Sequence, residues 1–140
     1  MFLGSAVETG ELALPPDGPT SWVARDDLGE AIARLLVTDF RGRRSLSLTG
    51  PRALDFADVA AIASEIVGRP IRRRIIPPSE YIGAMVARGV SPPMATMLAT
   101  GFASRAAGEL ALVDATLATV VGRPARAVEE VLPGLLGKNR

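Results

Sequence analysis

Two long stretches of the chain place apolar residues at helical spacing. The first predicts a helix that begins at Asp26 or Asp27 as N-cap, with one buried face formed by Leu28, Ala31, Ile32, Leu35 and Leu36. The second predicts a helix that ends at a left-handed Gly68, with a buried face formed by Phe56, Val59, Ala60, Ala63, Ile66 and Val67. The apolar pattern therefore predicts two amphipathic helices in the first half of the chain.

Short extended segments and further helices fill the remainder. Strands are expected at residues 11–14, 22–24, 45–48 and 71–76, the last of them closed by two prolines. Other helices are expected before Gly10, at 81–88 after Ser79, from Pro92 after Ser91, up to Val121 after Asp114, and at about 126–132. No linker long enough to separate two units interrupts this order, so residues 1–140 are expected to form a single domain.

The turn between the strand at 45–48 and the next helix has the layout of a phosphate-binding loop but not its chemistry. Gly50 is its one glycine, and Pro51 after it has no N–H to offer an anion. Asp55 stands at the N-cap position and Asp58 three residues later, which already places carboxylates on the free amides of the helix. The turn is therefore interpreted as a structural connection that fixes how a helix leaves a strand.

Three consecutive arginines, Arg72, Arg73 and Arg74, lie within the last predicted strand. Alternation along a strand lets at most two of them share one side. They could form an anion site, but a solvated edge strand protected by its charges is the favoured interpretation.

Composition excludes several function classes. Sixteen Lys and Arg against fifteen Asp and Glu leave a net charge of +1, and aromatic residues make up 4%, so nucleic acid is not an expected partner. The chain has no cysteine and no histidine, which removes disulfides, thiol catalysis, the usual zinc sites and any histidine base. No metal is therefore expected.

Hydropathy sets the expected environment. No apolar run reaches the roughly 18 residues that a membrane span needs, so a soluble, cytoplasmic protein without a membrane partner is expected. A hydrophobic content of 48% is nevertheless high for a short chain, and part of this apolar surface is expected to meet a partner.

Methionine and aromatic residues occur along the two helices predicted after Pro78. Tyr81, Met85 and Phe102 recur in the two helices predicted there, while Trp22 is the one indole. Such a group most often fills a core, because flexible methionine side chains close irregular gaps. The alternative is a pocket for a flat apolar molecule, which Tyr81 or Trp22 would orient.

Asp26 and Asp27 are adjacent carboxylates that could form an acid–base site. Adjacent helical residues point about 100° apart, so the two do not face each other, and capping explains them better than catalysis. Glu109 and Asp114, on either side of an apolar loop, are less specific still.

Three segments taken together resemble a known family: SWVARDDLGEAIARLL, SLSLTGPRALDFADVAAIASEIVGRPIRRRIIPPSEYIGAMVARGVSPPMATMLA and VDATLATVVGRPARAVEEVL. They are similar to the C-terminal half of the NmrA-like atypical short-chain dehydrogenase/reductases, and most of all to the NAD(P)H-dependent quinone oxidoreductases. The similarity runs in order from about Leu3 to Leu136. Its most specific part is Leu-Thr-Gly-Pro at 48–51, then a helix, Gly-Arg-Pro, a strand and a Ser-Glu-Tyr helix start.

The resemblance implies an α/β fold made of the last strands and the substrate-lobe helices of an NmrA-like Rossmann fold, helix-rich with a small sheet. Members of the family use NADPH or NADH, held by an N-terminal Rossmann half that these residues do not match. No cofactor is therefore expected to bind this chain alone. Strands without neighbours are expected to be completed by homo-oligomerisation or by a separate nucleotide-binding half.

The function that the resemblance implies is the substrate-binding portion of an oxidoreductase acting on quinone-like or flat carbonyl compounds, without redox activity of its own. The alternative is a cofactor-free small-molecule binder or a non-redox enzyme of isomerase or cyclase type, acting as a homo-oligomer. A noncatalytic regulator is a third, weaker interpretation.

Each function draws on a different set of side chains. In the first, the contacts to a small apolar or aromatic molecule are expected from Phe2, Trp22, Tyr81, Met85 and Phe102. In the second, acid–base help would come from Asp27, Tyr81 or Glu109, since no histidine is present.

Overall fold

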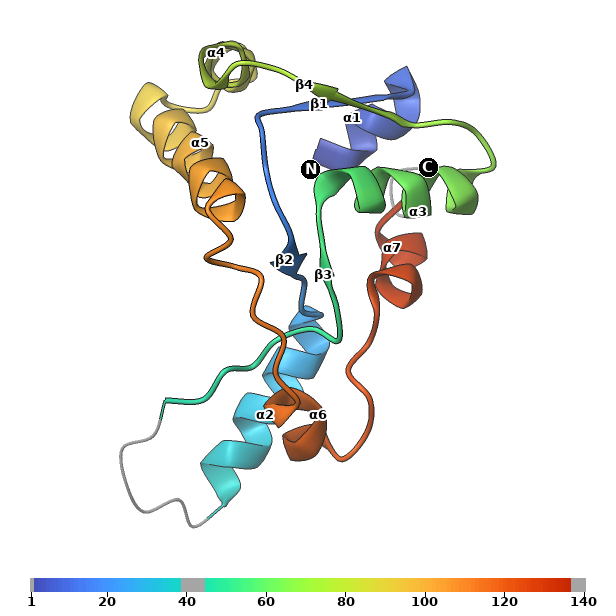
Figure 1. The fold of residues 1–140 in the computed structure, drawn as a ribbon, viewed down its shortest axis with the longest axis vertical. Helices are drawn as coiled ribbons and strands as arrows, with labels where there is room; N and C mark the ends of the chain where they lie inside the picture. The colour runs from blue at the N-terminus through green and yellow to red at the C-terminus, as the bar shows by residue number, and fades with distance from the viewer. Residues whose placement is uncertain (1, 39–44, 137–140) are drawn as a thin grey trace.

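The structure, a computed structural model, describes the chain from residue 2 to 38 and from 45 to 136 (Figure 1). The helices in this part are α1 (Phe2–Thr9), α2 (Arg25–Val37), α3 (Phe56–Val67), α4 (Pro78–Ala87), α5 (Pro92–Ala106), α6 (Thr116–Val121) and α7 (Val128–Leu136). The strands are β1 (Glu11–Leu14), β2 (Thr20–Ser21), β3 (Ala53–Leu54) and β4 (Arg72–Ile75). The predicted class, a helix-rich α/β fold with little sheet, is confirmed.

Strands pair in two small sheets. β1 and β4 run parallel, with Glu11 opposite Arg72 and Leu14 opposite Ile75, and β2 pairs antiparallel with β3. Helix α3 leads into β4, as a parallel pair requires, because its strands need a crossover between them. The strands predicted at 11–14 and 71–76 therefore form one sheet.

Two other predicted strands are wrong. Residues 22–24 lie just beyond β2, and residues 45–48 form no strand; the chain next becomes extended at β3. A strand persists only where a neighbour completes its ladder of hydrogen bonds, and within the described residues neither segment has one. Next to residues 45–48, a side chain rather than a strand partner connects the chain to its neighbour: the Thr49 hydroxyl accepts a 2.8 Å hydrogen bond from the N–H of Asp114.

Helix α3 begins and ends as its sequence predicts. The Asp55 carboxylate accepts hydrogen bonds from the N–H groups of Ala57 and Asp58, and the Asp58 carboxylate accepts one from the N–H of Asp55, which completes a capping box. Gly68 closes the helix with a φ of 69°. The predicted inner face is confirmed except at Ile66, whose side chain remains 37% exposed.

Helix α2 differs from its prediction at both its start and its face. Ala24, not Asp26 or Asp27, occupies the N-cap position. Ala31 is fully buried, but Ile32 is 46% and Leu36 80% exposed. The apolar stripe of α2 is thus only partly covered, since its main described neighbour is the short helix α6.

Of two other helix starts, that of α4 differs from its prediction and that of α5 agrees in position. Pro77, not Ser79, precedes the first residue of α4. Ser91 does precede α5 with Pro92 at the first position, although its side chain makes no capping hydrogen bond. Proline suits such a start because the missing N–H would have had no partner within the helix.

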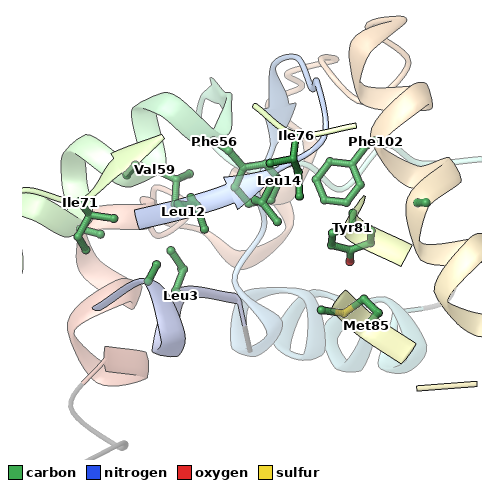
Figure 2. Close-up of a cluster of buried hydrophobic side chains, with 14 of the residues drawn as sticks. Leu3, Leu12, Leu14, Phe56, Val59, Ile71, Ile76, Tyr81, Met85 and Phe102 are labelled. Carbon is green, nitrogen blue, oxygen red and sulfur yellow. The ribbon is translucent and has the colours of Figure 1, made fainter. Parts of the chain in front are cut away.

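Two groups of buried side chains hold the structure together. The larger one contains Leu12, Leu14, Phe56, Tyr81 and Phe102 and joins α1, the β1–β4 sheet, α3, α4, α5 and α7; these five residues are labelled in Figure 2. The smaller one joins α2 to α6 through Ala31, Leu117 and Val121. In Figure 1 these two groups lie at opposite ends of the molecule, with β2 and β3 between them.

The three arginines of β4 separate as strand alternation requires. Arg72 and Arg74 are exposed, whereas the side chain of Arg73 is 10% exposed and pairs with Asp17 at 2.8 Å. The Arg73 guanidinium also donates to the carbonyls of Leu14 and Pro15. The middle arginine therefore fixes the turn after β1 from within, which the interpretation as a solvated edge strand did not foresee.

Gly50 is required by close packing of the backbone. A Cβ placed on it would lie 1.6 Å from the carbonyl oxygen of Trp22, closer than any side chain could tolerate. The interpretation of this turn as structural therefore has a physical basis, because the glycine lets two backbone segments meet.

Candidate functional site

The candidate site is an apolar cavity of about 320 Å³ between the two ends of the molecule. Its wall combines residues from α1, the segment after β2, α3, α4, α5 and α7, including Trp22, Phe56, Tyr81, Phe102, Arg105, Arg126, Val131 and Leu132. Such a volume is sufficient for a small ring compound, and the predominance of apolar lining is typical of ligand sites.

Aromatic rings form one side of this cavity in a continuous series. The Trp22 and Phe56 ring centroids lie 5.3 Å apart at 67°, and Phe56 lies 5.8 Å from Phe102. Tyr81 meets Phe102 edge-on at 5.1 Å; Figure 2 shows these two rings next to each other. Each separation lies in the range at which aromatic pairs attract each other, so the rings support one another's orientation.

Trp22 is fixed by its polar edge. Its indole Nε1–H donates a 2.9 Å hydrogen bond to the carbonyl of Leu54 in β3. Because Gly50 approaches the Trp22 backbone so closely, the indole is held from both its main chain and its ring. A ring held in this way presents a preformed surface to a ligand.

Tyr81 contributes a ring that is 2% exposed and a hydroxyl in low-dielectric surroundings. Burial raises the pKa of this phenol above its usual 10, and the positive charge of Arg105 opposes the rise only in part. The hydroxyl therefore keeps its proton at neutral pH. It can donate a hydrogen bond but is not a base.

Arg105, in the last turn of α5, brings a positive charge into the apolar wall. Its Cζ lies 5.6 Å from the centroid of Trp22 and 5.7 Å from that of Phe102, within the range of a cation–π interaction. Its Nη1 donates to the carbonyl of Gly101 at 2.7 Å. The guanidinium is therefore oriented by the aromatic rings and by its own helix.

Asp27 lies in a separate cluster behind the α7 side of the cavity. Its fully buried carboxylate accepts from the Arg123 guanidinium at 2.8 Å and from the backbone N–H of Arg126 at 2.7 Å. Desolvation acts to raise the Asp27 pKa, but these hydrogen bonds outweigh it and hold the pKa below its usual 3.8. The Arg123 hydrogen bond likewise lowers the pKa of Glu30.

The cavity collects three of the five residues predicted to touch a ligand. Trp22, Tyr81 and Phe102 line it. Met85 does not: it borders a second hollow of about 260 Å³ on the other side of Tyr81, beside β1. The side chain of Phe2 lies outside the described part of the structure.

The three acid–base candidates do not converge. Of Asp27, Tyr81 and Glu109, only Tyr81 lines the cavity. Asp27 is engaged by two arginines, and Glu109 is exposed after the end of α5. Neither carboxylate, Asp27 or Glu109, therefore lies where it could exchange a proton with a molecule in the cavity.

Sequence reasoning missed the charged part of the wall, Arg105 and Arg126, and the apolar residues of α7. A signal for Arg105 was present, because Leu98, Phe102 and Arg105 are spaced by four and three residues and share a face of α5. Arg126 and α7 gave no such signal, since their place depends on a chain reversal after α6.

The described residues contain neither a group arranged for a metal ion nor a helix suited to a membrane. No cluster of three His, Cys, Asp or Glu side chains in residues 2–38 and 45–136 is arranged to hold a metal ion. Across the same residues, no helix combines the length and the apolar character needed to cross a membrane.

Comparison with known proteins shows which proteins this chain is similar to. No family model matches the chain. Among curated proteins it is 31% identical over 131 residues to an NAD(P)H azoreductase of Xenophilus azovorans, covering 93% of this chain and 46% of the relative. It is 28% identical over 143 residues to an NmrA-like family domain-containing oxidoreductase of Aspergillus flavus, covering the whole chain and 47% of the relative.

Solved structures show the same fold. An NADPH-dependent quinone oxidoreductase of Escherichia coli superposes with a TM-score of 0.87 at 23% identity, over 96% of this chain and 50% of the other. A triphenylmethane reductase of Citrobacter sp. gives a TM-score of 0.87 at 21% identity, over 96% of this chain and 47% of the other.

These likenesses show that the chain has the α/β fold of NmrA-like proteins of Rossmann type. The chain is a homologue of NmrA-like and NAD(P)H-dependent oxidoreductases, and it spans about half the length of the relatives it matches. The resemblance predicted from the sequence motifs is therefore confirmed.

Proposed function

We propose that this chain is the substrate-binding portion of an NmrA-like NAD(P)H-dependent oxidoreductase that acts on quinone-like or other flat carbonyl compounds. The observation that carries the proposal is the 320 Å³ cavity whose wall contains the rings of Trp22, Phe56, Tyr81 and Phe102. A flat conjugated molecule stacks favourably against such rings, and the apolar wall excludes water from it. Relatives named as a quinone oxidoreductase and an azoreductase support the same class of compound.

The turn at Gly50 does not fit the pyrophosphate of a nicotinamide cofactor. A pyrophosphate is normally held by a glycine-rich turn whose N–H groups face the anion. The comparable turn here has Pro51 next to Gly50, and the backbone of Trp22 fills the space on the glycine. We therefore propose no hydride step through these residues; NADPH or NADH, as used in the family, would be bound by a separate nucleotide-binding half.

The chain's own contribution would be to bind and orient the substrate. The aromatic rings fix the plane of the molecule, while the protonated Tyr81 hydroxyl and the Arg105 guanidinium bring positive potential to the cavity. Positive potential favours a carbonyl that gains electron density as it is reduced. These residues would thus prepare the substrate for a reductant supplied from elsewhere.

Exposed apolar residues of α2 support the proposal that another polypeptide packs against this chain. Leu36 and Val37 are 80% and 87% exposed, and Ile32 beside them is 46% exposed. A nucleotide-binding half or a second copy of the chain would cover this surface. Native mass spectrometry with and without NADPH distinguishes them: a discrete homo-oligomer that ignores NADPH favours the second copy, whereas uptake of NADPH contradicts the proposed lack of a cofactor site.

Titration with 1,4-naphthoquinone tests the substrate class directly. Trp22 is the one tryptophan in the sequence, so quenching of its fluorescence reports occupation of the cavity. Val131→Phe places a ring in the cavity wall and should weaken binding by about tenfold or more, because overpacking removes space for the ligand. Val86→Phe, on α4 and outside both hollows, is the matched control and should bind as the unchanged chain does.

Absence of saturable quenching, or equal weakening by the two valine variants, would contradict the proposal. The cofactor-free alternative with acid–base residues has no specific observation in its favour, since only Tyr81 of its three candidates reaches the cavity.

A further inference from the structure

Arg105 differs from the other guanidinium in the cavity wall in how its charge is balanced. Arg126 lies 3.3 Å from a carboxylate oxygen of Asp26 and 3.5 Å from one of Asp27. Among the described residues, no carboxylate lies within 4 Å of Arg105, although this side chain is partly buried. Within the described residues, Arg105 therefore brings a positive charge to the cavity wall without a close counter-ion.

The hydrogen bonding of Arg105 is also incomplete. Its Nη1 donates to the carbonyl of Gly101, but its Nε–H is buried and has no acceptor. A buried charged donor without a partner is costly, and the cost is relieved when an acceptor arrives. The Nε edge is one of the sides from which guanidinium groups bind carboxylates with two parallel hydrogen bonds.

Aromatic contacts explain how the charge is kept in place without an acid. Trp22 and Phe102 both lie within 6 Å of the guanidinium carbon, so their rings hold the group beside the space where a ligand ring would stack. A ligand that carries an oxyanion on a flat ring would meet both features together. Because Nε is shielded from water, a small rotation of the Arg105 side chain must accompany binding.

We propose that Arg105 makes the cavity selective for flat aromatic compounds bearing a carboxylate, which the guanidinium binds while the ring packs against Trp22 and Phe102. This inference rests on the proposed function, since it names a narrower ligand class for the same cavity. It makes Arg105 a specificity-determining residue. An apolar cavity without a usable cation would instead disfavour a carboxylate, because burying an unpaired charge is expensive.

Two probes of equal shape separate these possibilities. Calorimetric titration of the full chain with 2-naphthoate and with 2-naphthamide compares a carboxylate with a neutral carboxamide on the same ring. We expect 2-naphthoate to bind at least about tenfold more tightly, as a charge-assisted hydrogen bond in a shielded site provides. Arg105→Gln should reduce this ratio to about one or below, since the shorter amide keeps N–H donors but not the charge.

The matched control is Arg69→Gln, an exposed arginine in the turn between α3 and β4, outside both hollows, which should leave the ratio unchanged. Arg105→Lys keeps the charge but not the planar fork, and should retain a reduced preference for the acid. If Arg105→Gln does not fold, the proposal is tested by two binding ratios. The unchanged chain must prefer 2-naphthoate, and Arg105→Lys must show a smaller preference.

Each outcome has a distinct meaning. Equal binding of the two probes to the unchanged chain, or a ratio that survives Arg105→Gln, overturns the role of Arg105 while leaving the apolar cavity and its proposed function intact. Failure of both probes to bind overturns the proposed function as well. A ratio that falls with Arg105→Gln and not with Arg69→Gln supports the assignment.

Discussion

The carboxylate of Asp27 and the backbone N–H of Arg126, 99 residues apart in sequence, are joined by a 2.7 Å hydrogen bond. This bond ties the first turn of α2 to the segment between α6 and α7. Arg126, Ala127 and Val128 in and after that segment line the cavity. A buried acid that does not itself line the cavity therefore fixes one wall of the candidate site.

Replacing Asp27 should strongly destabilise the chain. Asp27→Asn removes the buried charge that Arg123 and Arg126 pair with, and because these two arginines are 34% and 40% exposed, the expected cost is that of a charged hydrogen bond, about 1.5–3 kcal/mol. Asp26→Asn is the matched control: its side chain is 86% exposed, and a surface pair contributes at most about 1 kcal/mol. Urea unfolding measures both, and equal losses would show that Asp27 is not the buried anchor described here.

Acid should weaken the fold through the same carboxylate. Because the folded-state pKa of Asp27 lies below its unfolded value near 3.8, the unfolded chain binds more protons at low pH. The stabilisation is fully present above about pH 5 and is lost as the pH falls through the lowered pKa. The free energy of unfolding, followed from neutral pH to about pH 2, should fall less steeply in Asp27→Asn; an unchanged slope would contradict this origin.

Two glycines should respond in opposite directions to alanine. Gly50→Ala places a Cβ 1.6 Å from the Trp22 carbonyl oxygen and must displace backbone, so we expect a large loss of stability and a shifted Trp22 emission. Gly83→Ala, inside α4 with nothing within 4 Å of the new Cβ, should stabilise by about 0.5–1 kcal/mol. Thermal unfolding with fluorescence detection measures both, and tolerance of Gly50→Ala would disprove the close backbone approach.

A charge introduced on the inner face of α3 should disrupt folding far more than one introduced on its outer face. Val59 is 4% exposed and also lines the cavity, so Val59→Asp buries an unpaired charge and should prevent folding. Ile66 is 37% exposed on the same helix, and Ile66→Asp should leave the chain folded with a smaller loss. Far-ultraviolet circular dichroism separates the two results; loss of folding in both variants would mean that Ile66 is covered by another body.

The capping box of α3 should contribute on its own. Asp55→Ala removes the acceptor of two backbone N–H groups, and the loss of such a cap costs about 0.5–2 kcal/mol. Glu65→Ala, an exposed acid near the other end of α3, should change stability by less than about 0.5 kcal/mol. Urea unfolding of the pair tests whether the effect arises from capping rather than from loss of an acid.

Local features were readable from the sequence because neighbouring residues decide them. The capping box at Asp55 and Asp58 and the left-handed Gly68 depend on contacts within a few positions or on backbone preference. The structural interpretation of Gly50 also followed locally, since Pro51 lacks the N–H that an anion site requires. The motifs around these positions were sufficient to indicate the class of protein.

Only the tertiary structure decided the roles of residues whose partners are distant. Asp27 resembles a helix cap in sequence, but its partners Arg123 and Arg126 lie 96 and 99 residues away. The segment at 45–48 has strand composition yet no adjacent strand in the described chain, and Leu36 belongs to the apolar stripe of α2 yet is 80% exposed. Pairing and burial are properties of what lies alongside a residue, and local sequence does not contain that information.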